Sequence, residues 1–119
     1  MAPSDAGRPL PGLRLCAVDD VADPGSLGFR FREGEAQFVG FVVRVGDRLT
    51  GYVDRCPHAG WPLALAGDRF LTRDGAHILC GAHGALFRPE DGVCVAGPCL
   101  GQALAPWPIE VREGQVFTA

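Results

Sequence analysis

The chain has 119 residues, the length of one ordinary domain. Its 11 Lys and Arg against 14 Asp and Glu give a formal net charge of −3, which argues against a nucleic-acid partner because nucleic acids bind basic surfaces. No apolar run approaches membrane-spanning length, and the N-terminal stretch has neither an apolar core nor a twin arginine, so we expect no membrane anchor and no export signal.

In chain order, residues 1–12 are expected to form a disordered N-terminal arm and residues 13–119 a single domain. The 17 Gly and 10 Pro interrupt the chain too often for long helices. We expect strands at Leu13–Val18, Phe29–Arg32, Phe38–Val45, Leu49–Asp54, Ala76–Leu79, Leu86–Phe87, Val93–Val95, Ile109–Arg112 and Gln115–Thr118. Short strands with regular turns predict an all-β fold, an antiparallel sandwich or small barrel.

Two local features add detail to this pattern. The strands Phe38–Val45 and Leu49–Asp54 are expected to form a hairpin, turned at Gly46-Asp47, that brings Cys56 to its tip. The one helical candidate is a single turn at Asp23–Ser26. The chain shows neither internal repeats nor a low-complexity tract.

Cysteine and histidine occur together twice, as Cys56-Pro-His58 and as Cys80-Gly-Ala-His83, with 21 residues (59–79) between the two motifs. Four such residues in two matched pairs indicate a metal site. Two chemistries use them: a structural tetrahedral zinc ion, or a Rieske-type [2Fe–2S] cluster in which two thiolates hold one iron and two imidazoles hold the other.

The spacing favours the diiron interpretation. Structural zinc sites of this composition usually place both cysteines first and both histidines last. A Cys-x-His pair such as Cys56 and His58 is short for both side chains to chelate one tetrahedral ion. Two adjacent irons remove this constraint, because each pair can place its cysteine on one iron and its histidine on the other.

The chain resembles the Rieske family from about Leu13 to the C-terminus. Cys56–Leu63 and Cys80–Phe87 resemble the two cluster-binding loops of that family. Gly97-Pro-Cys99, followed by Leu104 and Pro108–Val111, resembles its third, proline-containing loop and closing strands. The connection between the motifs is longer than usual in short members of the family, which leaves the shape of the Asp68–Gly75 segment open.

The resemblance implies a Rieske iron–sulfur fold with two cluster-binding loops and one [2Fe–2S] cluster per chain. The four ligands carried over from the family are Cys56, His58, Cys80 and His83. It also implies a soluble one-electron carrier, similar to the ferredoxins that pass electrons from a flavin reductase to a terminal oxygenase.

The residues around the motifs favour a low reduction potential. High-potential Rieske proteins carry an extra cysteine in each loop, where this chain has Trp61 and Ala82, and two hydroxyl side chains, where it has Ala85 and Phe87. Pro57 also has no N–H to donate. Fewer hydrogen bonds to the cluster sulfurs predict a potential of roughly −150 mV rather than +300 mV.

The chain by itself is not expected to be an enzyme. It has no glycine fingerprint for a nicotinamide or flavin cofactor, and only His77 remains for an oxygenase iron site. Two alternatives stay open: a small subunit of a multi-component oxidoreductase of the nitrite-reductase type, and a structural zinc-binding interaction domain.

The remaining cysteines favour a reducing, cytoplasmic setting, since the total of five is odd and two are assigned to the cluster. We expect Cys94 and Cys99 to be small buried apolar residues rather than a disulfide, and Cys16 to lie in the core. His77 is expected to be exposed, and Trp107 to cover a sheet.

Overall fold

The computed structural model describes residues 7–57, 63, 70–80 and 84–119, called the described residues below. Their strands are β1 (Arg14–Ala17), β2 (Gly25–Glu33), β3 (Ala36–Val45), β4 (Arg48–Val53), β5 (Ile78–Leu79), β6 (Leu86–Phe87), β7 (Cys94–Ala96), β8 (Ile109–Arg112) and β9 (Gln115–Thr118). A 3-10 turn, η2 (Val18–Asp20), follows β1. The predicted all-β class is confirmed, and the last hairpin has the predicted bounds.

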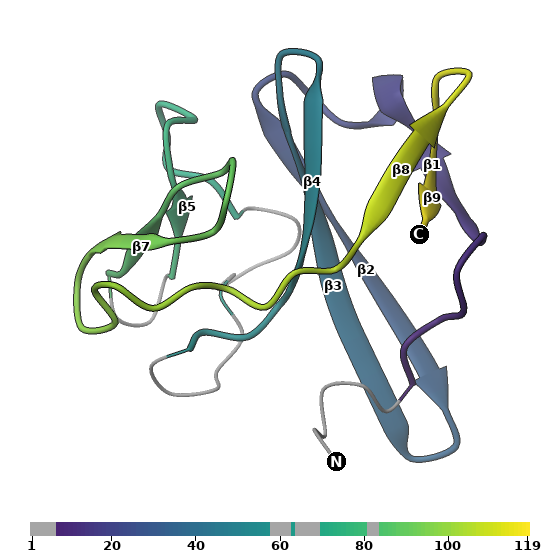
Figure 1. Cartoon of the computed structure of the whole chain (residues 1–119), viewed down its shortest axis with the longest axis horizontal. Helices are drawn as coiled ribbons and strands as arrows, with labels where there is room; N and C mark the ends of the chain where they lie inside the picture. The colour runs from purple at the N-terminus through teal and green to yellow at the C-terminus, as the bar shows by residue number, and fades with distance from the viewer. Residues whose placement is uncertain (1–6, 58–62, 64–69, 81–83) are drawn as a thin grey trace.

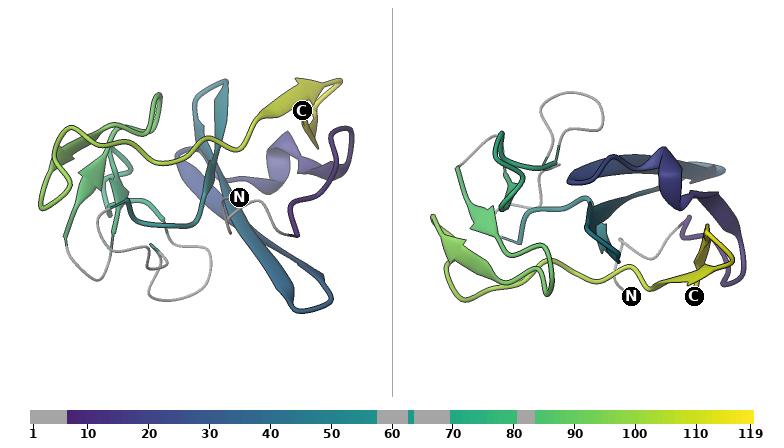
Figure 2. Two further views of the ribbon diagram at one scale, coloured as in Figure 1. Left: turned by 60° about the horizontal axis from the view of Figure 1, so that its bottom comes forward. Right: turned by 90° about the horizontal axis from the view of Figure 1, so that it is seen from above.

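The strands form three small antiparallel sheets, in the orders β1-β9-β8, β2-β3-β4 and β5-β6-β7. The β2-β3-β4 sheet lies in the middle, with the β5-β6-β7 sheet on one side of it and the β1-β9-β8 sheet on the other (Figure 1). The two turned views keep the same order (Figure 2). The molecule therefore has a central sheet with a different small sheet at each side.

Strand β3 is buried on both faces, which explains its nearly continuous run of Phe and Val. Successive side chains of a strand point to opposite faces. Phe38 and Val42 join the core around Trp107, whereas Phe41 and Val43 join the core that contains the cysteines of the two motifs. A strand covered on both sides is apolar throughout instead of alternating.

Trp107 fills the core on one face of the central sheet, as the sequence predicts. Its ring meets those of Phe29, Phe31 and Phe38 edge to face, with centroid distances of 6.0, 6.1 and 5.2 Å. Gly40 of β3 makes room for it, because a Cβ there would lie 2.5 Å from Trp107 Cε3. The Trp107 side chain is 1% exposed, so this ring anchors the central sheet.

The segment 104–107 runs along β4 and connects the β5-β6-β7 sheet to β8 (Figure 1). The Leu104 N–H donates to the Gly92 carbonyl, the Val53 N–H to the Ala105 carbonyl and the Trp107 N–H to the Gly51 carbonyl, each at 2.9 Å. These bonds tie the flanking sheets to the same edge of the central sheet.

The long connection between the two motifs contains an additional hairpin. Leu71 pairs with Ile78, the Thr72 N–H donates to the His77 carbonyl at 2.8 Å, and the Leu79 N–H donates to the Phe70 carbonyl at 2.8 Å. His77 is therefore half-buried, and the prediction of an exposed histidine is wrong, because its backbone belongs to this hairpin. Residues 64–69 lie outside the described residues.

The predicted helical turn at Asp23–Ser26 is wrong. Strand β2 already begins at Gly25, which pairs with Arg44, and Ser26 pairs with Val43. Pro24 disfavours a helical conformation of the residue before it, and β3 provides partners for the residues after it. The one helical turn in the described residues is η2, which lies five residues earlier.

Residues 1–6 of the predicted arm lie outside the described residues. Residues 7–12 run beside the C-terminal strand: the Gly12 N–H donates to the Thr118 carbonyl at 2.8 Å, and the Thr118 hydroxyl donates to the Leu10 carbonyl at 2.8 Å. The Arg8 guanidinium lies 5.0 Å from the centre of the Phe38 ring. Within the described residues, no helix has the length and hydrophobicity needed to cross a membrane.

Candidate metal centre

Cys56 lies three residues beyond the end of β4 and is fully buried. The β3–β4 pairing extends to Asp54, whose N–H donates to the Val39 carbonyl at 2.9 Å. The prediction that the hairpin brings Cys56 to its tip is wrong in this detail. The turn at Gly46-Asp47 joins the two strands at one end, and Cys56 follows the strand at the opposite, open end.

Asp54 holds the two ends of the first loop together. Its Oδ1 accepts a hydrogen bond of 2.7 Å from the backbone N–H of Leu63. Burial raises the pKa of the Asp54 carboxyl, and the Leu63 N–H and Arg30 partly offset that rise. Leu63 is fully buried in the same core as Cys56. In the sequence His58 falls between Asp54 and Leu63, and it is outside the described residues.

Cys80 directly follows β5 at the start of the second loop and is fully buried. The Cys80 N–H donates to the Ala85 carbonyl at 2.9 Å, and the Gly84 N–H donates back to the Cys80 carbonyl at 2.8 Å. Gly84 has a φ of +72°, which glycine adopts without strain. These bonds close a short loop, 80–85, whose residues 81–83, including His83, lie outside the described residues.

The structure brings the two predicted cysteine ligands into one apolar core. Cys56 and Cys80 are both 0% exposed and pack in a cluster with Phe41, Phe87 and other buried residues. Neither forms a disulfide. The two histidines are not among the described residues, and the described part of the chain alone contains no cluster of three or more potential metal ligands. Two buried thiols on adjacent loops fit the sulfur half of a [2Fe–2S] site.

The third loop packs directly on the second. Gly97 has a φ of +100°, and a Cβ there would lie 2.7 Å from the Ala85 Cα, so only glycine permits this approach. The loop is closed by the Cys94 N–H, which donates to the Gln102 carbonyl at 2.7 Å, and by the Gln102 N–H, which donates to the Cys99 carbonyl at 2.8 Å. This geometry holds Cys99 on the inside of the loop.

Cys94 and Cys99 are buried and unbridged, as the sequence predicts. The Cys99 thiol donates to the Cys94 Sγ at 3.1 Å, and the Cys94 thiol donates to the Ala96 carbonyl at 3.2 Å. Burial raises the pKa of Cys99 to about 12, with further contributions from the neighbouring Cys94 and Cys56 thiols. The resemblance of Gly97-Pro-Cys99 to the third loop of the family already suggested that Cys99 could lie near the cluster region, and the structure places it in the same core as Cys56 and Cys80. Cys16 is in the core, as predicted.

The two positions where high-potential relatives carry hydroxyl groups are fully buried here. Ala85 and Phe87 are each 0% exposed and belong to the same apolar cluster as Cys56 and Cys80. Neither side chain can donate a hydrogen bond. The core around the two cysteines therefore lacks hydroxyl donors at both positions.

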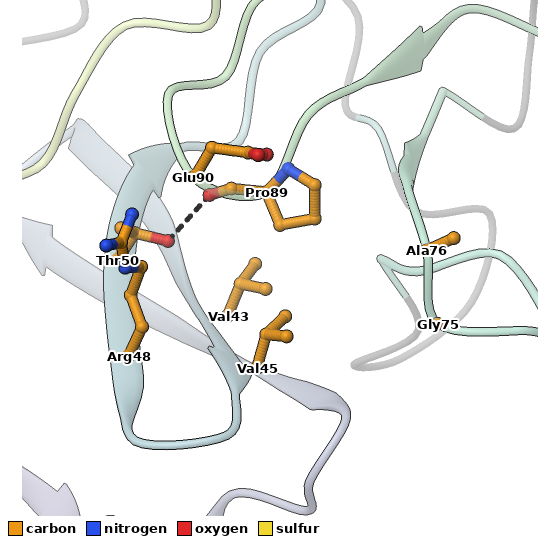
Figure 3. A pocket seen from close by; sticks show the side chains of 8 residues that line it. All are labelled: Val43, Val45, Arg48, Thr50, Gly75, Ala76, Pro89 and Glu90. Atoms are coloured by element: carbon orange, nitrogen blue, oxygen red, sulfur yellow. Dashed lines mark hydrogen bonds between the residues drawn. The ribbon is translucent and has the colours of Figure 1, made fainter.

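A surface hollow of about 340 Å³ lies elsewhere, between the β3–β4 hairpin and two turns (Figure 3). Its walls are formed by Val43, Val45, Arg48, Thr50, Gly75, Ala76, Pro89 and Glu90. The Thr50 hydroxyl is already bonded to the Pro89 carbonyl at 2.9 Å, and one cation and one anion complete the lining. Of the predicted ligands in the described part of the chain, neither Cys56 nor Cys80 lines this hollow.

A comparison with known families decides the identity of the cysteine–histidine loops. The Rieske [2Fe-2S] domain profile matches residues 13–112, most of the chain and both motifs. The chain belongs to the Rieske [2Fe–2S] domain family. The cofactor of this family is a [2Fe–2S] cluster, so the structural zinc alternative is not supported.

Solved structures agree with the assignment to the Rieske family. A chain in the complex of reduced oxygenase and oxidised ferredoxin in carbazole 1,9a-dioxygenase is 29% identical, with a TM-score of 0.67 over 90% of this chain and 91% of that one. The ferredoxin of Sphingomonas yanoikuyae B1 is 25% identical, with a TM-score of 0.64 over 89% and 95% of the two chains. The carbazole 1,9a-dioxygenase ferredoxin of Nocardioides aromaticivorans IC177 is 19% identical, with a TM-score of 0.65 over 91% and 98%, and shows the fold alone.

These findings confirm the Rieske fold, similar to that of ferredoxins, and the [2Fe–2S] cluster as the cofactor of the family. The comparison with curated proteins gave no match. The family match extends over the third loop, so Cys99 belongs to the same domain as the two motifs.

Proposed function

We propose that this Rieske protein carries single electrons from a flavin-dependent reductase to a terminal oxygenase. The observation that carries the proposal is the match, at 29% identity and nearly full length in both chains, to a chain in a complex of an oxygenase and a ferredoxin. The likeness to the Sphingomonas ferredoxin, again over nearly the whole of both chains, supports a stand-alone carrier.

We propose Cys56, His58, Cys80 and His83 as the four ligands. When bound, the [2Fe–2S] cluster supplies a centre that takes up and releases one electron. The support is the order of donors in the sequence together with the burial of both cysteines in one core. Residues 13–119 would form the cluster domain, and residues 1–12 would precede it as an arm.

The protein's own residues have two tasks in this proposal. The Asp54–Leu63 bond and the Cys80–Ala85 bond fix the loop ends, so that the ligands are positioned before the cluster is inserted. The apolar residues around the cysteines, among them Phe41 and Phe87, exclude water from the sulfur side. Both features favour a stable site that needs little rearrangement when its charge changes.

We infer a potential near the low end of the Rieske range, roughly −150 mV rather than +300 mV. The support is the absence of a hydroxyl at Ala85 and Phe87 and of an N–H at Pro57. We also propose a cytoplasmic setting, since all five cysteines are unbridged and reducing compartments keep thiols in that state.

The first experiment tests the cluster and its ligands. The purified protein should contain two irons and two sulfides per chain, be red-brown and give a rhombic EPR signal when reduced. Cys80→Ala should abolish the signal, because it removes one of the two proposed thiolate ligands, whereas the matched variant Cys16→Ala, in a different core cluster, should retain it. A colourless wild type that binds one zinc would refute the proposal.

The same preparation tests the role. The potential from a redox titration should be negative, and a clearly positive value would contradict the inferred hydrogen-bond deficit. A flavin-dependent ferredoxin reductase should reduce the protein, and a terminal Rieske oxygenase should reoxidise it in stopped-flow mixing. Co-purification of the chain in a fixed complex with a larger oxidoreductase would instead favour the subunit alternative.

A further inference from the structure

Three buried thiols meet beside the first cluster loop. Cys56 and Cys99 are 0% exposed and Cys94 is 2% exposed. The Cys99 Sγ lies 3.1 Å from the Cys94 Sγ, and Cys56, which also raises the pKa of Cys99, belongs to the same buried cluster. Cys99 is therefore the middle member of a row that begins on the third loop and ends on a proposed ligand.

Backbone contacts of the third loop fix the position of Cys99. The third loop is closed between Cys94 and Gln102, and Gly97 is pressed onto Ala85 of the second loop. The Cys99 side chain thus points into the core from a loop that is anchored to the ligand loops. A donor held in this way needs no rearrangement to reach its acceptor.

We propose that Cys99 is a positioning residue that donates a hydrogen bond from its thiol to the Sγ of Cys56 in the cluster-loaded protein. This bond raises the reduction potential of the cluster. This inference rests on the proposed function, in which Cys56 is a ligand. A thiol hydrogen rotates freely about the Cβ–Sγ bond, so it can point to either neighbouring sulfur. The ligand sulfur carries negative charge and is the stronger acceptor, whereas Cys94 is neutral and its own hydrogen already goes to Ala96.

Cys99 can donate a hydrogen bond where other positions near the ligands cannot. Pro57 has no N–H, and Ala85 and Phe87 have no hydroxyl, so three positions near the ligands cannot donate. A hydrogen bond to a ligand sulfur stabilises the reduced state, which carries one more negative charge. Cys99 would supply such a bond from the third loop.

The test compares variants of the cluster-loaded protein by redox titration. Cys99→Ala and Cys99→Val remove the donor, and Cys99→Ser keeps one. We expect both apolar variants to lower the ratio of reduced to oxidised protein at a fixed potential by about threefold to tenfold, where tenfold corresponds to 59 mV for a one-electron couple. Cys99→Ser should stay close to wild type. Potentials of the apolar variants equal to that of wild type would overturn the proposal.

Cys94→Ala is the matched control, because it removes a buried thiol from the same row but leaves the donor in place. Its potential should equal or slightly exceed that of wild type, and a fall as large as in Cys99→Ala would assign the effect to packing and overturn the proposal. A second readout is resonance Raman in H₂O and D₂O. The Fe–S(Cys) bands of wild type should shift on deuteration, and this shift should be smaller in Cys99→Val.

Two further outcomes separate the possible failures. If wild type carries no [2Fe–2S] cluster, the proposed function itself fails. If wild type carries the cluster but mass spectrometry under non-reducing conditions shows a Cys94–Cys99 disulfide, only the hydrogen-bond proposal fails, because Cys99 would then have no hydrogen to donate.

Discussion

The two sides of the molecule are built by different means. The base, which we define as the sheets β2-β3-β4 and β1-β9-β8, has strands of 4 to 10 residues and an aromatic core around Trp107. The cluster side, the sheet β5-β6-β7 with its loops, has strands of 2 or 3 residues. It is held by single backbone hydrogen bonds across its loops and by an apolar core that contains Phe87 and the buried cysteines. The difference shows that sheet pairing stabilises the base, whereas specific contacts position the site.

The segment 104–107 links the two sides, since its N–H and carbonyl groups bond both to β4 and to the turn before β7. Each side nevertheless packs around its own core, so a change around Trp107 in the base can alter global stability without altering the loops. A change in a loop bond should alter the site first. The following predictions test this separation, from the largest expected effect to the smallest.

Trp107→Ala should cost the most stability. Truncating a fully buried aromatic ring leaves a cavity against Phe38 and Gly40, and such changes cost about 3–5 kcal/mol. Chemical denaturation monitored by circular dichroism measures the loss, and Trp107→Phe, which refills part of the space, should recover much of it. Because the ring lies on the face of the central sheet opposite the cysteine core, the potential of the folded variant should match that of wild type. A shifted potential would contradict the separation of the two sides.

Asp54→Ala should act on the first loop. It removes the acceptor of the Leu63 N–H, and a part-buried donor without a partner costs about 1–3 kcal/mol. We expect faster loss of iron to a chelator, followed by the decay of the visible absorbance, with a smaller change in the denaturation midpoint than in Trp107→Ala. Asp54→Asn keeps an oxygen that can accept the same bond and serves as the control. Equal rates of iron loss in the alanine variant and wild type would show that this bond does not hold the loop.

Asp91→Asn should have the smallest effect, confined to the turn between β6 and β7. The Val93 N–H and then the Arg88 guanidinium lower the pKa of the Asp91 carboxyl below its ordinary value of 3.8. A lowered pKa adds stability above the ordinary value, and this contribution disappears as the pH falls through the lowered pKa. The Tm of wild type should slightly exceed that of Asp91→Asn at pH 7, and the difference should vanish in acid. If the difference in Tm between wild type and Asp91→Asn grew in acid, the predicted sign of the pH dependence would be wrong.

The sequence by itself determined the class of fold, most strands and the family. Alternating and continuous apolar runs between Gly and Pro turns located the β3–β4 and β8–β9 hairpins, because strand pairing at short separation is encoded locally. The motifs Cys56-Pro-His58 and Cys80-Gly-Ala-His83 identified the cluster chemistry, because ligand type and spacing depend on the metal rather than on the remote chain.

Only the tertiary structure decided how distant segments meet. The bond between Asp54 and Leu63, the close approach of Gly97 to Ala85 and the burial of Cys99 in the same core as Cys56 all depend on tertiary packing. The half-buried His77 and the start of β2 at Gly25 were mispredicted for the same reason, since hairpin and sheet partners overrode local preference. The proposed ligands therefore follow from the sequence alone, whereas the surroundings that would adjust their chemistry depend on the folded core.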